Sequence, residues 1–305
     1  MEKILILGTG SVGSEIACFF YNKYKITCID HGKNFNVMKK QLPNIKFVKS
    51  DINDFELIKT ESVDCKMIFY CIDTGGVIGC MKYPEKYYDV NITNFNELLN
   101  SLKVKKPHFF LLSSIFVYPD IPNVTEKTRP NPLTLYGKLR MQQEQILMNQ
   151  KCGFTILRLS NIFGYGHFVD VGNMGAIEKF INSVFTGNKI ILDGDGEQRV
   201  DYIYKEDLMI LLEKLTSDLT LKRVYNVSTG LVKPISEVAH IIKDIAIKKF
   251  GKNVEVIISD KNSKSPNLPK ASPHKVMKEF SWKPLTDFYS QITHMMETCN
   301  LQHKR

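Results

Sequence analysis

The stretch Ile4-Leu5-Ile6-Leu7-Gly8-Thr9-Gly10-Ser11-Val12-Gly13 decides the fold of this chain. An apolar strand runs into the pattern G-x-G-x-x-G, and a helical pattern follows it. We expect Gly8 to allow a tight turn, Gly10 to let a pyrophosphate approach the backbone, and Gly13 to let the helix pack on the strand. The free N–H groups at the helix N-terminus favour the same phosphates. The loop residues predicted to contact a dinucleotide are Gly8, Gly10, Ser11, Val12 and Gly13.

A carboxylate follows this loop at the expected spacing. Asp30 ends the next apolar strand, about 20 residues downstream, where it would accept hydrogen bonds from ribose hydroxyls and repel a 2′-phosphate. This favours NAD over NADP. Asp51 and Ile52 follow the third strand and fit the adenine edge, although Asp51 could instead cap the next helix. We expect Cys71, at the end of the fourth strand, to lie under the cofactor. The alternative is a glycine-rich turn in a fold that binds no dinucleotide.

Strands alternate with helical patterns through the first half of the chain, from Lys3–Leu7 to Thr155–Leu159. Such alternation predicts βαβ units, a parallel sheet covered on both faces, and ligands at the C-terminal ends of the strands. Shorter helices and strands mix after Asn161. We therefore predict an α/β protein with a Rossmann-type doubly wound parallel sheet in residues 1–165. A smaller C-terminal substrate-binding domain in residues 166–305 is expected to return some segments to the first.

The composition excludes several classes of protein. The chain has 305 residues, of which 43% are hydrophobic and 24% charged, so wholesale disorder is excluded. No apolar run approaches the roughly 20 residues that cross a bilayer, and no signal peptide is recognisable. We expect a cytoplasmic protein that binds no membrane. The net charge of +9 comes mainly from dispersed lysines, because only six of the 41 basic residues are Arg. Nucleic acid is therefore not an expected partner.

Cysteine and histidine are scattered along the chain. The seven cysteines form no C-x-x-C pair, and most lie within apolar segments, as reduced thiols do. The seven histidines form no H-x-x-x-H or H-E-x-x-H pattern. We therefore expect no metal site. The segment Asp193–Glu197 lacks the further ligands of a calcium loop and is interpreted as a glycine turn.

Further motifs occur along the chain in the order found in one enzyme family. A serine pair ends a strand, a tyrosine begins a helix, and three later segments follow in the same order: Leu112–Tyr118, Tyr136–Glu144, Arg158–Gly164, Gly194–Tyr204 and Phe280–Pro284. With these motifs the chain resembles the extended short-chain dehydrogenase/reductases. More narrowly, it is similar to the NAD-dependent epimerase/dehydratase family, which acts on nucleotide sugars.

The resemblance assigns roles around the reacting sugar carbon. Tyr136 would be the general base when a hydroxyl is oxidised and the general acid in the reverse direction, and Ser114 would hydrogen-bond the reacting oxygen. Arg140 stands where the family has Lys, one helical turn from Tyr136 and on the same face. It would supply positive charge and bind the nicotinamide ribose, although guanidinium and ammonium differ in shape. Asn91 matches a family Asn in the preceding helix. Cofactor-binding roles therefore extend to Asn91, Tyr136 and Arg140.

Two further departures from the family concern the type of reaction and the binding of the substrate. Ile115 and Phe116 occupy the places where 4,6-dehydratases carry an Asp-Glu pair, and neither transfers protons. The resemblance therefore favours hydride transfer at C4, in a 4-epimerase or a 4-keto reductase/dehydrogenase. Val200 replaces the arginine that binds the substrate diphosphate in the family.

Other residues are left to bind the nucleotide sugar. Asn161 matches a family position that contacts the diphosphate. Arg199 is adjacent to Val200 but should point to the opposite face of a strand. His167 follows a strand end, where it would meet the substrate or remain a surface residue.

Two further expectations follow from the resemblance. Helices Glu85–Leu102 and Leu135–Asn149 resemble those that form a four-helix interface, which predicts a homodimer; alternatively they only cover the sheet. The rival to an enzyme is a non-catalytic NAD-binding sensor or scaffold protein with the same fold.

Overall fold

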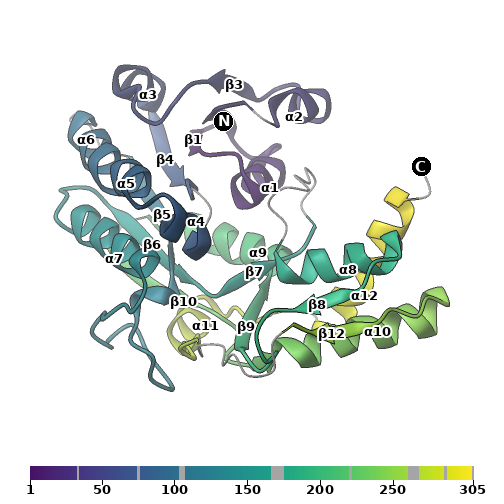
Figure 1. Ribbon diagram of the computed structural model, residues 1–305. Helices are drawn as coiled ribbons and strands as arrows, with labels where there is room; N and C mark the ends of the chain where they lie inside the picture. Colours follow the sequence, from purple (N-terminus) through teal and green to yellow (C-terminus); the bar gives the residue numbers. More distant parts are fainter. Residues whose placement is uncertain are drawn as a thin grey trace.

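The computed structural model describes residues 1–32, 34–73, 76–102, 107–165, 175–219, 222–259, 268–284 and 287–303. Within these ranges seven parallel strands form the central sheet, in the order β10-β6-β5-β4-β1-β2-β3 (Figure 1). The order reverses between β1 and β4, and ligands bind at such a switch point in doubly wound sheets. The strands are β1 (Lys3–Leu7), β2 (Lys25–Asp30), β3 (Lys46–Lys49), β4 (Cys65–Tyr70), β5 (His108–Ser114), β6 (Phe154–Leu159) and β10 (Arg223–Val227).

Helices cover both faces of this sheet because its strands are apolar on both sides (Figure 1). One apolar cluster joins the sheet to α1 (Ser11–Phe20), α2 (Phe35–Gln41), α9 (Lys205–Thr216) and α11 (His274–Phe280). A second cluster on the opposite face joins it to α3 (Phe55–Ser62), α6 (Asn94–Ser101) and α7 (Leu135–Met148). The predicted α/β doubly wound sheet is thus confirmed.

The segment expected to be one long helix before β5 has three parts. After α4 (Gly76–Lys82), helix α5 (Pro84–Tyr88) continues through the π-helical turn η1 (Asp89–Thr93) into α6. Asn91 lies within the π turn and is buried, and its side-chain amide donates a hydrogen bond to Tyr87 O at 2.8 Å.

The second unit has its own apolar cluster. Its elements are β7 (Asn161–Phe163), α8 (Ala176–Thr186), β8 (Ile190–Leu192), β9 (Arg199–Tyr204), β11 (Val232–Pro234), α10 (Ile235–Phe250), β12 (Val256–Ile258) and α12 (Phe288–His303). Strands β11, β9 and β7 form one small sheet, and β12 pairs with β8. The later part of the chain also serves the first unit, because β10 extends the large sheet and α9 and α11 pack on its face.

Several elements were not predicted from the sequence. Helices α2, α3, α4 and α11 are each eight residues or shorter, so they leave little periodicity to detect. Helix α12 is longer, but its apolar side is built from Ile292, Met295, Met296 and Cys299 within a polar sequence. Among the described residues, no helix is long and apolar enough to cross a membrane.

Candidate active site

The glycine loop places the start of α1 directly against the end of β1. Gly8 has a φ of +89°, which favours glycine, and its N–H donates to Ile29 O at 2.9 Å. A Cβ at Gly13 would lie 1.9 Å from Gly8 O, so only glycine allows this close packing. A Cβ at Gly10 would meet nothing within 4 Å, which leaves open space beside the first-turn amides of α1. This opening fits the pyrophosphate of a dinucleotide.

Asp30 holds the same loop from the end of β2. Its carboxylate accepts hydrogen bonds from Thr9 N at 2.6 Å and from Gly32 N at 3.2 Å. The side chain is therefore fixed at the edge of the sheet, next to the loop that it was predicted to assist.

The residues after β3 and β4 border the same edge. Asp51 is exposed, accepts from Asn53 N at 3.2 Å and lies 3.7 Å from His31, whereas Asp54 rather than Asp51 caps α3. Ile52 is buried in the core. The Cys71 N–H donates to Leu7 O at 2.8 Å, and its Cβ lies 3.2 Å from the position that a Cβ on Gly13 would occupy. Cys71 therefore lies beside the start of α1.

Helix α7 begins against the turn that follows β5. Thr134 caps the helix by accepting from Gly137 N at 3.0 Å. A Cβ at Gly137 would lie 2.2 Å from Phe116 O, so glycine lets the helix approach the short turn η2 (Ile115–Val117). The Tyr136 and Phe116 rings meet edge to face at 5.7 Å, and Phe116 N donates to Ser114 Oγ at 3.3 Å. Ser114 and Tyr136 are thus connected through Phe116.

The structure adds a residue that sequence reasoning missed. Asp73, in the loop after β4, accepts hydrogen bonds from Tyr136 Oη at 3.0 Å and from Gly76 N at 3.1 Å. The same carboxylate oxygen that meets Tyr136 lies 2.9 Å from an Arg140 guanidinium nitrogen. The sequence did carry one signal for Asp73. It is a carboxylate in the loop that follows a strand bordering the switch point, where ligands bind in such sheets.

Arg140 is enclosed by its partners. Its side chain is 3% exposed, its guanidinium lies over the Tyr136 ring at 5.2 Å, and it donates to Gln143 Oε1 at 2.9 Å. Two weaker bonds of 3.4 Å reach Ile72 O. The expectation that residues 136 and 140 share a helix face is therefore correct in geometry, and the guanidinium is directed to the loop after β4.

These contacts shift the ionisation of the three groups. Burial raises the pKa of Tyr136, Arg140 lowers it and Asp73 raises it, which leaves it at about 12. Burial acts to raise the pKa of Asp73, but the charge of Arg140 and hydrogen bonds from Gly76 and Tyr136 bring it below its ordinary value. Burial acts to lower the pKa of Arg140, but Tyr136 and Asp73 raise it overall. Tyr136 is consequently a neutral phenol beside an ion pair at neutral pH.

A buried ion pair fixes the second half of α7. The Arg158 guanidinium donates hydrogen bonds to the Glu144 carboxylate, and the shortest of these is 2.6 Å. Ser113 Oγ donates to the same carboxylate at 2.5 Å. Arg158 also donates to Tyr118 Oη at 2.8 Å, and that hydroxyl donates to Asn226 Oδ1 at 2.7 Å. The helix that carries Tyr136 is therefore connected to β5, β6 and β10 by one buried ion pair and by the hydrogen bonds around it.

Two of the residues predicted to bind the nucleotide sugar, Asn161 and Arg199, lie on strands of the second unit. Asn161 is exposed at the start of β7 and pairs with Tyr202 of β9. Arg199 is exposed at the start of β9, whereas Val200 is buried in the second core, as the alternation of a strand requires. Arg223 begins β10 opposite Thr155 at the other end of the sheet and pairs with Asp218. His167 lies outside the described residues.

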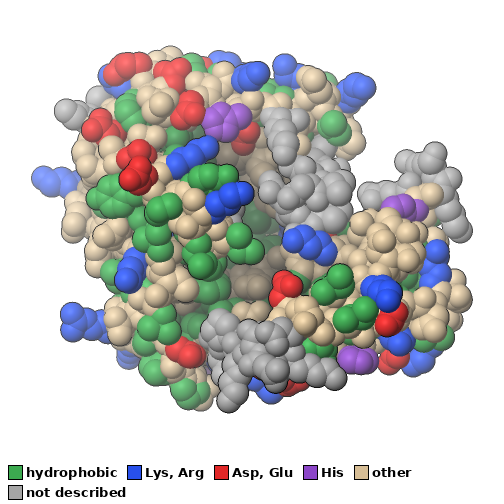
Figure 2. Space-filling model, viewed as in Figure 1, with side chains coloured by type: hydrophobic (Ala, Val, Ile, Leu, Met, Phe, Trp, Pro, Cys, Tyr) green, Lys and Arg blue, Asp and Glu red, His purple; other side chains and the backbone are tan. Residues whose placement is uncertain are grey.

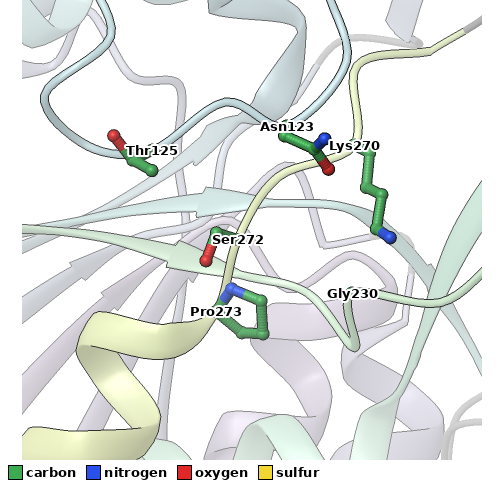
Figure 3. Close-up of a pocket in the computed structure, with 6 residues that line it drawn as sticks. All are labelled: Asn123, Thr125, Gly230, Lys270, Ser272 and Pro273. Carbon is green, nitrogen blue, oxygen red and sulfur yellow. The ribbon is translucent and has the colours of Figure 1, made fainter.

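The surface around these elements is hollowed. Figure 2 shows a depression between the part of the molecule over α4 and α7 and the part over α8 and β8. A pocket of about 400 Å³ opens where the chain before α7 meets the segment before α11 (Figure 3). Its lining residues, none of which was predicted as a site residue, are Asn123, Thr125, Gly230, Lys270, Ser272 and Pro273. Within the described ranges, no group of three or more His, Cys, Asp or Glu side chains could hold a metal ion.

The sequence model of the NAD dependent epimerase/dehydratase family matches residues 4–228, which include the glycine loop, Ser114, Tyr136 and Asn161. The chain belongs to this family. The resemblance seen in the motifs is confirmed, and with it an NAD-dependent enzyme of a family that acts on nucleotide sugars. NAD is the cofactor of the family, and the open space at Gly10 beside the α1 amides fits its pyrophosphate.

Several named enzymes are similar to this chain over most of its length. A UDP-glucose 4-epimerase from Lactobacillus helveticus is 26% identical, covering 93% of this chain and 92% of its own length. A dTDP-D-glucose 4,6-dehydratase from Dictyostelium discoideum is 26% identical over 81% of this chain and 63% of its own. The structure of a UDP-glucuronic acid 4-epimerase from Bacillus cereus, in complex with UDP-glucuronic acid and NAD, superposes with a TM-score of 0.85 at 20% identity and covers 98% of this chain and 99% of that one. The last likeness shows the shared fold.

Proposed function

We propose that this enzyme transfers hydride at C4 of a nucleotide-linked sugar, with 4-epimerisation or 4-keto reduction/oxidation as the net reaction. The observation that carries the proposal is at the C-terminal edge of the sheet: Arg140 lies over the Tyr136 ring, and Tyr136 contacts Phe116, whose N–H donates to Ser114 Oγ. The similarity to a UDP-glucose 4-epimerase over 93% of the chain supports the same reaction class.

The edge formed by β1, β2, β3 and β4 would hold the cofactor. When bound, NAD accepts hydride from the sugar carbon or returns it. The α1 amides would bind the pyrophosphate and Asp30 the adenosine ribose, with Asp51 and Ile52 at the adenine. The residues proposed to bind NAD are Gly8, Gly10, Ser11, Val12, Gly13, Asp30, Asp51, Ile52, Cys71, Asn91, Tyr136 and Arg140.

Tyr136 would exchange the proton of the reacting oxygen. In oxidation its phenolate removes the sugar hydroxyl proton, and in reduction its phenol returns a proton to the same oxygen. Ser114 Oγ would hydrogen-bond that oxygen and orient it. Arg140 would supply a fixed positive charge beside the phenol, because its guanidinium lies over the ring.

Dehydration is disfavoured by the groups after Ser114. Ile115 is buried and Phe116 packs on Tyr136, so this turn offers no acid or base for elimination.

We propose that residues 1–165 form the NAD-binding part and residues 166–305 the main substrate-binding part. Asn161, His167 and Arg199 are the candidates for contacts with the nucleotide sugar. The buried Val200 leaves no cation at the family's usual diphosphate position, so the side chain of another residue must supply that charge.

A homodimer is proposed from an apolar surface over α4, α5 and α7 (Figure 2). Large hydrophobic side chains are exposed there, namely Ile78, Met81, Tyr83, Tyr88 and Leu135. Such a patch marks a contact surface. We also propose a cytoplasmic location, since all seven cysteines are free thiols, as is usual in a reducing compartment.

The test is reduction of bound NAD by a panel of UDP-, GDP-, CDP- and dTDP-sugars, followed as reduced-nicotinamide absorbance and by product analysis. We expect absorbance and an epimer or keto sugar with at least one substrate. NAD binding without reduced-nicotinamide absorbance or product across the panel would support the non-catalytic sensor or scaffold protein. The ion pair between Arg140 and Asp73 favours that alternative. A chain that binds no NAD would overturn both.

A further inference from the structure

Asp73 gives the proton-transfer site an unusual charge balance. One carboxylate oxygen contacts the Tyr136 hydroxyl at 3.0 Å and the Arg140 guanidinium at 2.9 Å, while the other accepts from Gly76 N at 3.1 Å. The backbone bond fixes the carboxylate, and the side chain is 42% exposed rather than sealed in the core. The carboxylate is therefore held where it meets both groups.

Few charges face the Tyr136 phenol. Burial raises the pKa of Cys80, which packs in the same cluster, to about 11, and it raises the pKa of Tyr70 further. Both are therefore neutral near pH 7, so the charges acting on the phenol come from Asp73 and Arg140. The described titratable and charged groups around the phenol are Asp73 and Tyr70 from β4 and its loop, Cys80 from α4, Tyr87 from α5 and Arg140 from α7.

The two charges act on the phenol in opposite directions. A cation alone stabilises phenolate, the form required to remove a hydroxyl proton in oxidation. A carboxylate that accepts a hydrogen bond from the phenol stabilises the protonated form and repels phenolate. It also neutralises the guanidinium, so the cation loses much of its effect.

We propose that Asp73 is a positioning residue that keeps the proton on Tyr136 and offsets the charge of Arg140, so that the phenol is held in the protonated form, which is the form that donates in the reduction of a keto sugar. This deepens the proposed function and rests on it. In that reduction the bound reduced dinucleotide would supply a hydride, which carries the electron pair, to the carbonyl carbon. The C=O π bond opens, and the Tyr136 O–H bond breaks to protonate the oxygen. The products are a hydroxyl sugar, oxidised dinucleotide and tyrosinate, which regains a proton from water.

The test titrates the phenol directly and needs no substrate. Fluorotyrosine is placed at position 136 of the full chain, and fluorine NMR follows its ionisation in the otherwise unchanged protein, in Asp73→Asn and in Asp73→Glu. We expect Asp73→Asn to lower the apparent pKa by about 1 to 3 units, because Arg140 becomes unopposed. Asp73→Glu retains the charge and should retain the high value. The matched control Asp244→Asn removes an exposed carboxylate from α10 and should change nothing.

A second readout is the pH profile of oxidation. Asp73→Asn should move this profile to lower pH, because the phenolate that removes the hydroxyl proton then forms at lower pH. An unchanged fluorine titration in a folded Asp73→Asn protein overturns the inference. Absence of turnover in either direction, with the titration shifted as expected, overturns the proposed function and leaves the role of Asp73 intact.

Discussion

The two ends of the proposed cofactor site differ in how closely they follow a known pattern: the glycine loop keeps the general dinucleotide pattern G-x-G-x-x-G, whereas α7 departs from the family at Arg140. At the glycine loop, backbone sterics fix each position, since the Cβ missing from Gly13 would lie 1.9 Å from Gly8 O. At α7, Arg140 stands where the family has Lys and is paired with Asp73. The difference teaches that a loop whose glycines are required by close backbone contacts keeps its sequence pattern. A set of charged side chains from separate segments, such as Arg140 and Asp73, can change in identity and pairing.

The largest effect is expected at the α7 end. Tyr136→Phe should lower turnover by about 10²- to 10⁴-fold, because the phenol that is proposed to exchange the proton of the reacting oxygen is removed, while NAD binding persists. Steady-state kinetics and calorimetric NAD binding measure the two effects. The control Tyr289→Phe, at an exposed position on α12, should leave turnover unchanged. Full activity in Tyr136→Phe would move the chemistry away from α7.

The scaffold beneath α7 is tested by its buried ion pair. Arg158→Met leaves Glu144 buried and without its cation, which should lower the free energy of unfolding by about 3–5 kcal/mol in urea denaturation. Arg158→Met combined with Glu144→Leu should recover a large part of that loss, because the unpaired charge is gone. If the double variant is no more stable than the single one, charge burial is not the cause.

The glycine loop offers a matched pair of substitutions. Gly13→Ala should lower the free energy of unfolding by about 1–3 kcal/mol, because α1 must move away from β1. Gly10→Ala meets no atom within 4 Å and should leave stability nearly unchanged while weakening NAD binding. Thermal denaturation with and without NAD separates the two effects. Equal loss of stability in both variants would contradict the steric account.

The smallest effect is expected at Asp30. Asp30→Ala removes the carboxylate at the adenosine ribose and should raise the Kd for NAD by about tenfold, roughly 1.4 kcal/mol. Discrimination against NADP should fall in the same titrations, while Asp244→Ala should affect neither. Unchanged affinity for both dinucleotides would place the ribose elsewhere.

The sequence predicted the sheet because its strands are apolar runs bounded by turn residues, as in Lys3–Leu7. It also placed Tyr136 and Arg140 on one helix face, which follows from helical periodicity. Asp73 could not be found this way, since its partners lie 63 and 67 residues further along the chain and only folding brings them together. Helix α12 was not predicted for a related reason: its apolar face is defined by contacts in the second core rather than by a strong periodic pattern in the sequence.

Hydride transfer at C4 through Tyr136 is tested most directly in a single turnover. The NAD-loaded protein is mixed with UDP-sugars carrying hydrogen or deuterium at C4, and reduced-nicotinamide absorbance is followed in the wild-type chain and in Tyr136→Phe. We predict absorbance that deuterium at C4 slows and that Tyr136→Phe abolishes. Absorbance insensitive to deuterium at C4, or equally rapid in Tyr136→Phe, would contradict the account.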